Sequence, residues 1–312
     1  MSIINAYYSN TEEEYQEICH FLDELSRRDP NMLWESGRMN YWRYNIHADK
    51  DPQDRFFNEN VHVWRAEDNE IVGLCISEYG KNDLFIEVLP EHDEIYSEIF
   101  RWIEDVWAVT REEINIDLFG GDQRKISWLK ENGFDFQCHY ENKRYYDLDS
   151  IELGYQLENG FKIERFSESN DVSGRVALSQ SAFNNPSYSQ NNLNGLMASP
   201  DYIDEYHLIV ISPDNQPVAY CVGWHERANP DRGYIEPVGT HAEFRKRGFA
   251  KAVIRECFGR MKTNGIKIVE IASAAEQEIA NYLYESLTPQ DKREVHRYSK
   301  KVTVRKNESS NA

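Results

Sequence analysis

A short basic turn that contains a glycine most constrains how this chain can fold. The stretch 245–250, Arg-Lys-Arg-Gly-Phe-Ala, follows a predicted strand over 234–240 and opens a predicted amphipathic helix over 251–261. The first backbone N–H groups of a helix have no partner inside the helix, and the helix dipole adds partial positive charge beside them. Gly248 lets a ligand approach the backbone without a Cβ in the way. This arrangement predicts an anion-binding site that suits a diphosphate better than a single carboxylate.

The spacing of this turn differs from two common phosphate-binding loops. It matches neither G-x-x-x-x-G-K-[ST] nor G-x-G-x-x-G. It has the form Arg-x-x-Gly-x-Ala, and Glu-Pro-Val-Gly-Thr-His at 236–241 precedes it. The pattern resembles the coenzyme A pyrophosphate loop of the GNAT superfamily of acyl-CoA N-acyltransferases. The alternative is an ordinary basic helix start, but cations there oppose the helix dipole unless an anion binds.

Composition narrows the functional class. A chain of 312 residues suggests about two domains. The net charge of −19 argues against a general binder of nucleic acid or anionic membranes, and it mildly favours a cationic substrate. No apolar run reaches the length of a membrane span, and no secretory signal is visible at the N-terminus. The five cysteines are scattered, which is typical of reduced thiols in the cytoplasm and not of disulfides or a metal site.

The chain repeats itself at low similarity. The segment 68–77 resembles 214–223, and 128–134 aligns with 283–289. Each pair places the same kind of element at the same point of an α/β unit, so two copies are predicted. We expect a first domain over 1–150, a second over 151–306 and a disordered tail over 307–312.

Interleaved strands and helices predict an α/β fold with a mixed sheet flanked by helices. The GNAT resemblance implies two tandem domains, each a twisted and mostly antiparallel sheet, like a bacterial tandem type of the superfamily. It also implies that the sheet is split between its fourth and fifth strands, with acetyl-CoA wedged in the split as co-substrate. The resemblance covers 161–302 well and the first half only in outline.

The resemblance assigns the cofactor contacts to the second copy. Backbone amides of the turn would wrap the pyrophosphate, and the preceding strand would pair with the pantetheine arm. The predicted cofactor-binding residues are Val238, Gly239, Thr240, Arg245, Lys246, Arg247, Gly248, Phe249 and Ala250. The alternative is a plain core strand, but Pro237 in its middle removes a hydrogen-bond donor and marks a bulge or an edge.

Two residues are the predicted catalytic groups. The run 280–287 resembles the family's A-x-x-x-Y-E-x-L helix, in which the tyrosine lies near the coenzyme sulfur, so Tyr284 is the predicted proton donor to the leaving thiolate. A core aromatic is the alternative, and Thr288-Pro289 replace the family's usual Gly-Phe. Glu236, at the expected split, is the predicted base, with ordered water as the alternative. Glu226 and His241 are rival candidates, and a structural role is favoured for His241.

The first copy lacks these features. Acidic residues occupy 91–94 where the second copy has its basic turn, and Leu129 stands where Tyr284 stands. We therefore expect a degenerate domain without cofactor. An aromatic cluster follows its first predicted helix and could cradle a cation, although core packing is favoured. The members of the cluster are Trp34, Tyr41, Trp42 and Tyr44.

These observations predict an acetyl-CoA-dependent N-acetyltransferase of the cytoplasm that acts by direct attack of a primary amine. The acceptor is a small-molecule or peptide amine whose identity and acyl length stay open. No metal, nucleic acid or membrane partner is expected, and a homodimer is compatible with the sequence. The alternative function is a coenzyme-A-binding sensor or scaffold without turnover.

Overall fold

The computed structural model describes residues 4–304, so the tail at 307–312 lies outside the described residues. The chain divides into two compact units. Among the described residues, unit 1 comprises 4–39, 50–141 and 294–304, and unit 2 comprises 40–49 and 142–293. Each is a mixed α/β fold, as the sequence predicts. None of the described helices is both long and apolar enough to cross a membrane.

Unit 1 is a sheet with strand order β1-β2-β3-β4-β5-β12 and flanking helices. Its first helix, α1, begins at a side-chain cap, because the Thr11 side chain accepts a hydrogen bond from the N–H of Glu14, and the apolar residues of this helix are buried. The elements are β1 (Ile4–Tyr7), α1 (Glu12–Ser26), α2 (Ser36–Tyr41, which ends in unit 2), α3 (Arg55–Asn60), β2 (Val61–Arg65), β3 (Ile71–Ile76), β4 (Asp83–Val88), η2 (Pro90–Ile95), α4 (Tyr96–Trp102), η3 (Ile103–Trp107), η4 (Ala108–Thr110), β5 (Glu113–Phe119), α5 (Gln123–Glu131) and the first part of β6 (Asp135–Asp147).

Unit 2 is a sheet with strand order β6-β11-β10-β9-β8-β7. Its elements are η1 (Trp42–Ile46), β7 (Lys162–Arg165), α6 (Phe166–Ser169), α7 (Val172–Phe183), α8 (Gln190–Ala198), η5 (Asp204–Tyr206), β8 (His207–Ile211), β9 (Pro217–His225), β10 (Arg232–Thr240), η6 (Ala242–Phe244), α9 (Phe249–Thr263), β11 (Ile268–Ala274), α10 (Glu278–Glu285) and the start of β12 (Asp291–Lys301).

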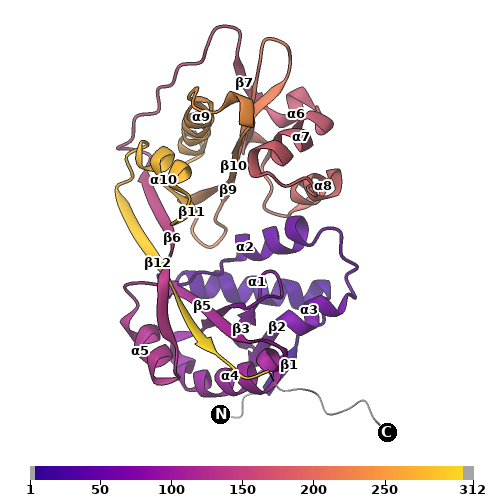
Figure 1. The fold of residues 1–312 in the computed structure, drawn as a ribbon, viewed down its shortest axis with the longest axis vertical. Helices are drawn as coiled ribbons and strands as arrows, with labels where there is room; N and C mark the ends of the chain where they lie inside the picture. Colours follow the sequence, from indigo (N-terminus) through magenta and orange to yellow (C-terminus); the bar gives the residue numbers. More distant parts are fainter. Residues whose placement is uncertain (1–3, 305–312) are drawn as a thin grey trace. The chain divides into compact units, whose positions relative to one another are not determined.

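The sheet of unit 2 is covered on both faces. Figure 1 shows α9 on one side of β9 and β10 and α7 on the other. The predicted apolar face of α9 is fully buried in the core on its side. A separate cluster that includes Leu178 of α7 and Leu193 of α8 packs on the opposite face. Burial of two apolar faces fixes the sheet rigidly, so the strand ends have defined positions.

Two strands cross the boundary between the sequence halves. The residues 295–301 of β12, at the end of the chain, pair antiparallel with β5 of unit 1. Conversely, the last residues of β6, from Asn142 onward, lie in unit 2, where β6 is the neighbour of β11. Each sheet is therefore completed by a strand from the other half of the sequence.

The internal repeat is visible in the backbone. The aligned segments 68–77 and 214–223 form equivalent hairpin turns, in which Asn69 and Asn215 both have positive φ, 73° and 60°. The segments after α5 and α10 also agree, because Gly133 and Thr288 occupy the same position of the alignment with φ of 82° and 60°. Asparagine and glycine tolerate this conformation, whereas a β-branched threonine is strained in it.

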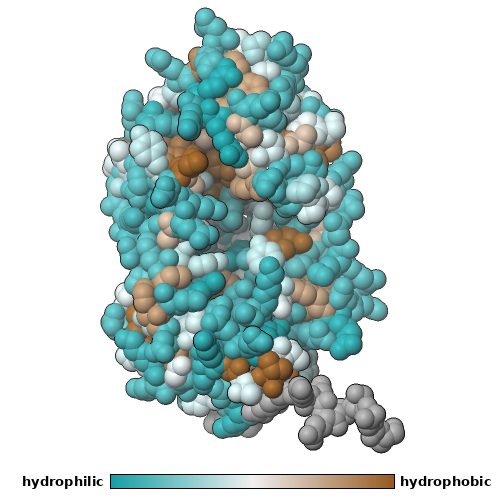
Figure 2. Space-filling model, in the orientation of Figure 1, coloured by the Kyte–Doolittle hydropathy of each residue, from teal (hydrophilic) through white to brown (hydrophobic). Residues whose placement is uncertain are grey.

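The surface is predominantly polar. Figure 2 shows hydrophilic residues over most of the visible face, with hydrophobic residues in small scattered patches. This agrees with the 54 acidic and 35 basic residues of the chain. Among residues 4–304, no group of three or more His, Cys, Asp or Glu side chains is arranged to hold a metal ion.

Candidate active site

The basic turn lies where the sequence predicts it, between β10 and α9 of unit 2. Lys246 and Gly248 both have positive φ, 62° and 82°. Gly248 is the N-cap of α9 and provides no side-chain hydrogen bond to the helix start. Among the described residues, no atom accepts a hydrogen bond from the N–H groups of 247–250. These amides are therefore available to an anion, as a helix N-terminus without a capping side chain should be.

The three cationic side chains of the turn differ in their contacts. The Arg245 guanidinium donates to the carbonyl of Ala182, at 2.8 Å. The Arg247 guanidinium donates twice to the carboxylate of Glu158, with 2.8 Å from Nε to Oε1, and this hydrogen bonding lowers the pKa of Glu158. Lys246 is exposed. Positive charge thus surrounds the free amides, and one carboxylate partly neutralises it.

The strand before the turn separates from its neighbour. β10 pairs with the parallel strand β11 only over Arg232 to Tyr234. Beyond this point β10 has a bulge between Ile235 and Val238, with a cis peptide bond before Pro237. From Val238 to Thr240 the strand pairs with β9 on one side, and among the described strands nothing pairs with it on the other. This leaves an unpaired backbone edge, which an extended ligand can join as an added strand.

Tyr284 lies on α10 and is only 7% exposed. Burial raises the pKa of its phenol well above the usual value, and the negative charge of Glu236 raises it further. The structure therefore brings the two predicted catalytic residues within electrostatic range of each other. Glu236 itself is exposed on β10, two residues beyond the last β10–β11 pair. A protonated phenol and an exposed carboxylate at one split are suited to giving and taking protons.

The rival residues have structural contacts. The His241 ring accepts a hydrogen bond from the N–H of Glu243 at 3.3 Å and caps η6. Glu226 accepts from the Asn229 side chain and pairs with Arg232 within the β9–β10 hairpin. Both side chains therefore take part in local structure, as expected from the sequence for His241.

The residues of the predicted aromatic cluster belong to two different units. Trp34 is buried in unit 1, whereas Tyr41, Trp42 and Tyr44 belong to unit 2. Trp42 is fully buried, and Tyr41 packs on the core beside α7 and α8. These contacts fit the packing interpretation.

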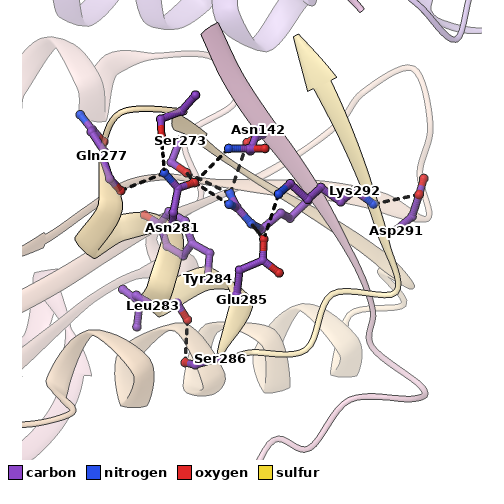
Figure 3. Close-up of polar contacts among 12 residues, drawn as sticks. Asn142, Ser273, Gln277, Asn281, Leu283, Tyr284, Glu285, Ser286, Asp291 and Lys292 are labelled. Atoms are coloured by element: carbon purple, nitrogen blue, oxygen red, sulfur yellow. Dashed lines mark hydrogen bonds and ion pairs between the residues drawn. The ribbon is translucent and has the colours of Figure 1, made fainter. Parts of the chain in front are cut away.

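Sequence reasoning missed a group of polar residues around α10. Figure 3 shows Asn142 and Ser273 converging on Asn281, one turn before Glu285 on α10. The buried Arg144 joins this group and donates to both Asn281 and Glu285. The available signal was the alternation of Asn142, Arg144 and Tyr146 on one face of a strand, which local pattern alone cannot assign to a partner.

The site of unit 2 therefore combines the amides of 247–250, the open edge of β10 and the buried phenol of Tyr284. Residues 180–288 match the model of the acetyltransferase (GNAT) family. This match includes the turn, Glu236 and Tyr284, and it confirms the resemblance predicted from the sequence. It supports acyl transfer in general as the chemistry of this segment.

Solved structures share the fold over nearly the whole chain. A GCN5-related N-acetyltransferase from Sphaerobacter thermophilus is 17% identical, with 96% of this chain and 95% of that chain covered and a TM-score of 0.64. A tandem GNAT protein from the clavulanic acid biosynthesis pathway is 10% identical, with 96% and 98% covered and a TM-score of 0.66. An acetyltransferase of the GNAT family from Colwellia psychrerythraea is 12% identical, with 96% and 100% covered and a TM-score of 0.59. At these identities the likeness shows the fold, including the tandem arrangement. No functionally curated protein matches the chain.

Proposed function

We propose that unit 2 binds acetyl-CoA and transfers its acetyl group to a primary amine by direct attack. The observation that carries the proposal is the row of free amides at 247–250, which follows a strand edge left open by the separation of β10 from β11. A diphosphate fits the amides and an extended pantetheine arm fits the edge. The acidic balance of the chain favours a cationic acceptor.

In the proposed reaction each group of residues would have a separate role. Acetyl-CoA supplies an acyl group activated as a thioester. The amides of 247–250 hold its diphosphate, and the backbone of Val238 to Thr240 aligns its arm. As the amine nitrogen bonds to the carbonyl carbon and the C–S bond breaks, Glu236 accepts the amine proton directly or through water. Tyr284 donates a proton to the sulfur, so the net reaction moves one proton from nitrogen to sulfur.

The raised pKa of Tyr284 excludes the opposite role, that of a base. A phenol that stays protonated at neutral pH is a donor and not a base. The alternative function, a sensor without turnover, depends on the unusual Thr288-Pro289 after the helix. Thr288, however, has the left-handed backbone that glycine adopts at the equivalent Gly133, so the chain leaves α10 in the usual way. The departure at Thr288-Pro289 is therefore no argument for a sensor without turnover.

The test is release of free thiol from acetyl-CoA in the presence of a panel of amines. We expect turnover with at least one cationic amine, and Tyr284→Phe should lower kcat about 100-fold with little change in KM, because general acid catalysis contributes roughly 10²–10⁴-fold. Tyr282→Phe is the matched control, since Tyr282 lies on the same helix and is 80% exposed. Equal activity of the two variants would remove Tyr284 from the mechanism, and no turnover with any amine would contradict the proposed function.

The ion pair between Arg247 and Glu158 gives a second, smaller prediction. Exposed ion pairs contribute about 0–1 kcal/mol, so Glu158→Gln should leave stability unchanged. It frees a guanidinium beside the amides, and we expect acetyl-CoA affinity to rise about threefold by calorimetry. Glu152→Gln, which removes the carboxylate that pairs with Arg255 farther along α9, is the control. Weaker binding to the Glu158→Gln variant would mean that Glu158 supports the loop and does not compete with the ligand.

A further inference from the structure

The proton donor of the proposed reaction stands on a helix that needs external support. α10 has eight residues and no side-chain N-cap, and Tyr284 is its one buried residue. Isolated helices of this length are unstable in water, so contacts with the rest of the fold must hold it. A shift of about 1 Å in a catalytic group can cost roughly 100-fold in rate. The contacts that hold α10 in place therefore determine the position of Tyr284.

Strand β6 provides this support through alternate residues. The Asn142 side chain donates to Asn281, at 3.1 Å, and the Tyr146 hydroxyl donates to the carbonyl of Tyr284, at 2.9 Å. Between them, Arg144 Nε donates to Glu285 Oε1, at 2.8 Å, and another guanidinium nitrogen donates to Asn281 Oδ1. Residues 142, 144 and 146 share one face of the strand. All three reach α10 or its backbone.

Arg144 is the centre of this arrangement. It is completely buried, and its Nη1 also donates to Ser273 of β11, at 2.9 Å. Its contacts on α10, Asn281 and Glu285, are four residues apart and lie on one helix face beside Tyr284. Asn281 in turn donates to the carbonyls of Ala274 and Gln277, as Figure 3 shows in part. A planar guanidinium with fixed donors can hold two helix positions and a strand at once, which an ammonium cannot do.

We propose that Arg144 is a positioning residue for the acyl transfer, holding α10 so that Tyr284 faces the reacting sulfur. This inference rests on the proposed function. It also gives the first half of the chain a role in the reaction, because β6 belongs to that half. The strand lies before the family-matched segment 180–288 and before residue 151, where the predicted second domain begins. The charge of Arg144 has a second effect, since it lowers the pKa of Tyr284 against the opposing effects of burial and Glu236.

The experiment is a double-mutant cycle on kcat in the full chain. Arg144→Met should lower kcat tenfold or more, with the acetyl-CoA dissociation constant unchanged within about twofold. In a Tyr284→Phe background the same change should lower kcat less than twofold, because Arg144 acts through Tyr284. Arg144→Lys should restore part of the activity. The control is Lys143→Met, which removes another buried ion pair on β6, the one with Glu270.

The outcomes separate the possible explanations. Arg144→Met could lower kcat equally with and without the Tyr284 hydroxyl, or Lys143→Met could lower kcat as much as Arg144→Met does. Either result would mean that Arg144 has a general structural role. It would overturn the inference and leave the proposed function intact. An inactive wild-type protein would overturn both. If the Arg144→Met variant does not fold, Arg144→Lys and Glu285→Gln replace it in the experiment. Each of these variants should lower kcat about threefold, and the double variant should have the same kcat as the single variants. Additive losses of kcat in the double variant would contradict the inference.

Discussion

Replacement of Gly248 by aspartate is expected to abolish measurable acetyl-CoA binding while α9 stays folded. Gly248 has a φ of 82° and open space where a Cβ would lie. Aspartate tolerates the left-handed region, so α9 can still form, and its carboxylate lies close to the amides that would hold the diphosphate. The same carboxylate repels a diphosphate by about 3 kcal/mol for each unit charge at about 5 Å, with an effective dielectric constant of about 20. We expect affinity to fall at least 100-fold by calorimetry.

Gly248→Asn is the matched control for this prediction. Asparagine has the same size and the same tolerance of positive φ but carries no charge. It should weaken binding about tenfold, because its Cβ stands where the ligand approaches, and both variants should melt within a few degrees of the wild-type protein. If aspartate and asparagine weaken binding equally, charge at the turn does not matter. If neither weakens it, the coenzyme binds elsewhere and the site is wrongly assigned.

Local sequence signals predicted the parts of the site that depend on local backbone chemistry. The turn at 245–250 could be found because glycine, basic residues and a helix start lie together in sequence. Pro237 marked the bulge that accompanies the separation of β10 from β11. Tyr284 followed from helix spacing and the family pattern. In each case the residues that determine the feature are neighbours in the chain.

The exchange of β6 and β12 could not be predicted in this way. β6 comes directly after the first copy's last helix, and its polar residues suggest a solvated strand face. Its Asn142 and Arg144 are nevertheless buried against residues more than 125 positions away. Which strands pair depends on loop closure and on the whole core, and no local pattern encodes it. The backbone of Thr288 was unpredictable for a related reason, since the fold imposes a conformation that threonine does not prefer.

A buried charge cluster occupies the corresponding split in unit 1. There β4 and β5 also pair in parallel, but only at Asp83 and Leu84, and Glu87 lies just beyond. Glu87 is 2% exposed, and its Oε1 accepts hydrogen bonds from the N–H groups of Leu33 and Trp34. The Lys125 ammonium lies 3.7 Å from Glu87 Oε2 and 3.5 Å from an oxygen of Asp29.

This cluster fills most of the split in unit 1. By the alignment of α5 with α10, Lys125 stands where unit 2 has the small Ala280. The cavity that remains beside Glu87, Tyr96 and Lys125 measures about 20 Å³, enough for about one water molecule. We therefore propose that unit 1 binds no coenzyme, and that the ion pair stabilises the closed split.

Replacement of Lys125 by methionine is expected to destabilise unit 1 by about 3–5 kcal/mol at neutral pH, because it leaves Glu87 as an uncompensated buried charge. Burial already raises the pKa of Glu87, and Lys125 is the main group that lowers it. Without Lys125 the pKa rises further, so the folded variant retains a proton that the unfolded chain releases. Its stability must then fall as pH rises, and the deficit should be largest near pH 8 and smaller near pH 5.

Denaturant unfolding followed by tryptophan fluorescence at pH 5 and pH 8 measures this effect. Five of the seven tryptophans lie in unit 1, namely Trp34, Trp64, Trp102, Trp107 and Trp128. Lys130→Met, on the exposed face of α5, is the control, and the double variant Glu87→Gln with Lys125→Met should recover most of the loss. If the loss of unfolding free energy is equal at both pH values, it comes from lost packing of the lysine side chain and not from its charge. A deficit below 1 kcal/mol would mean that the ion pair does not hold the split closed.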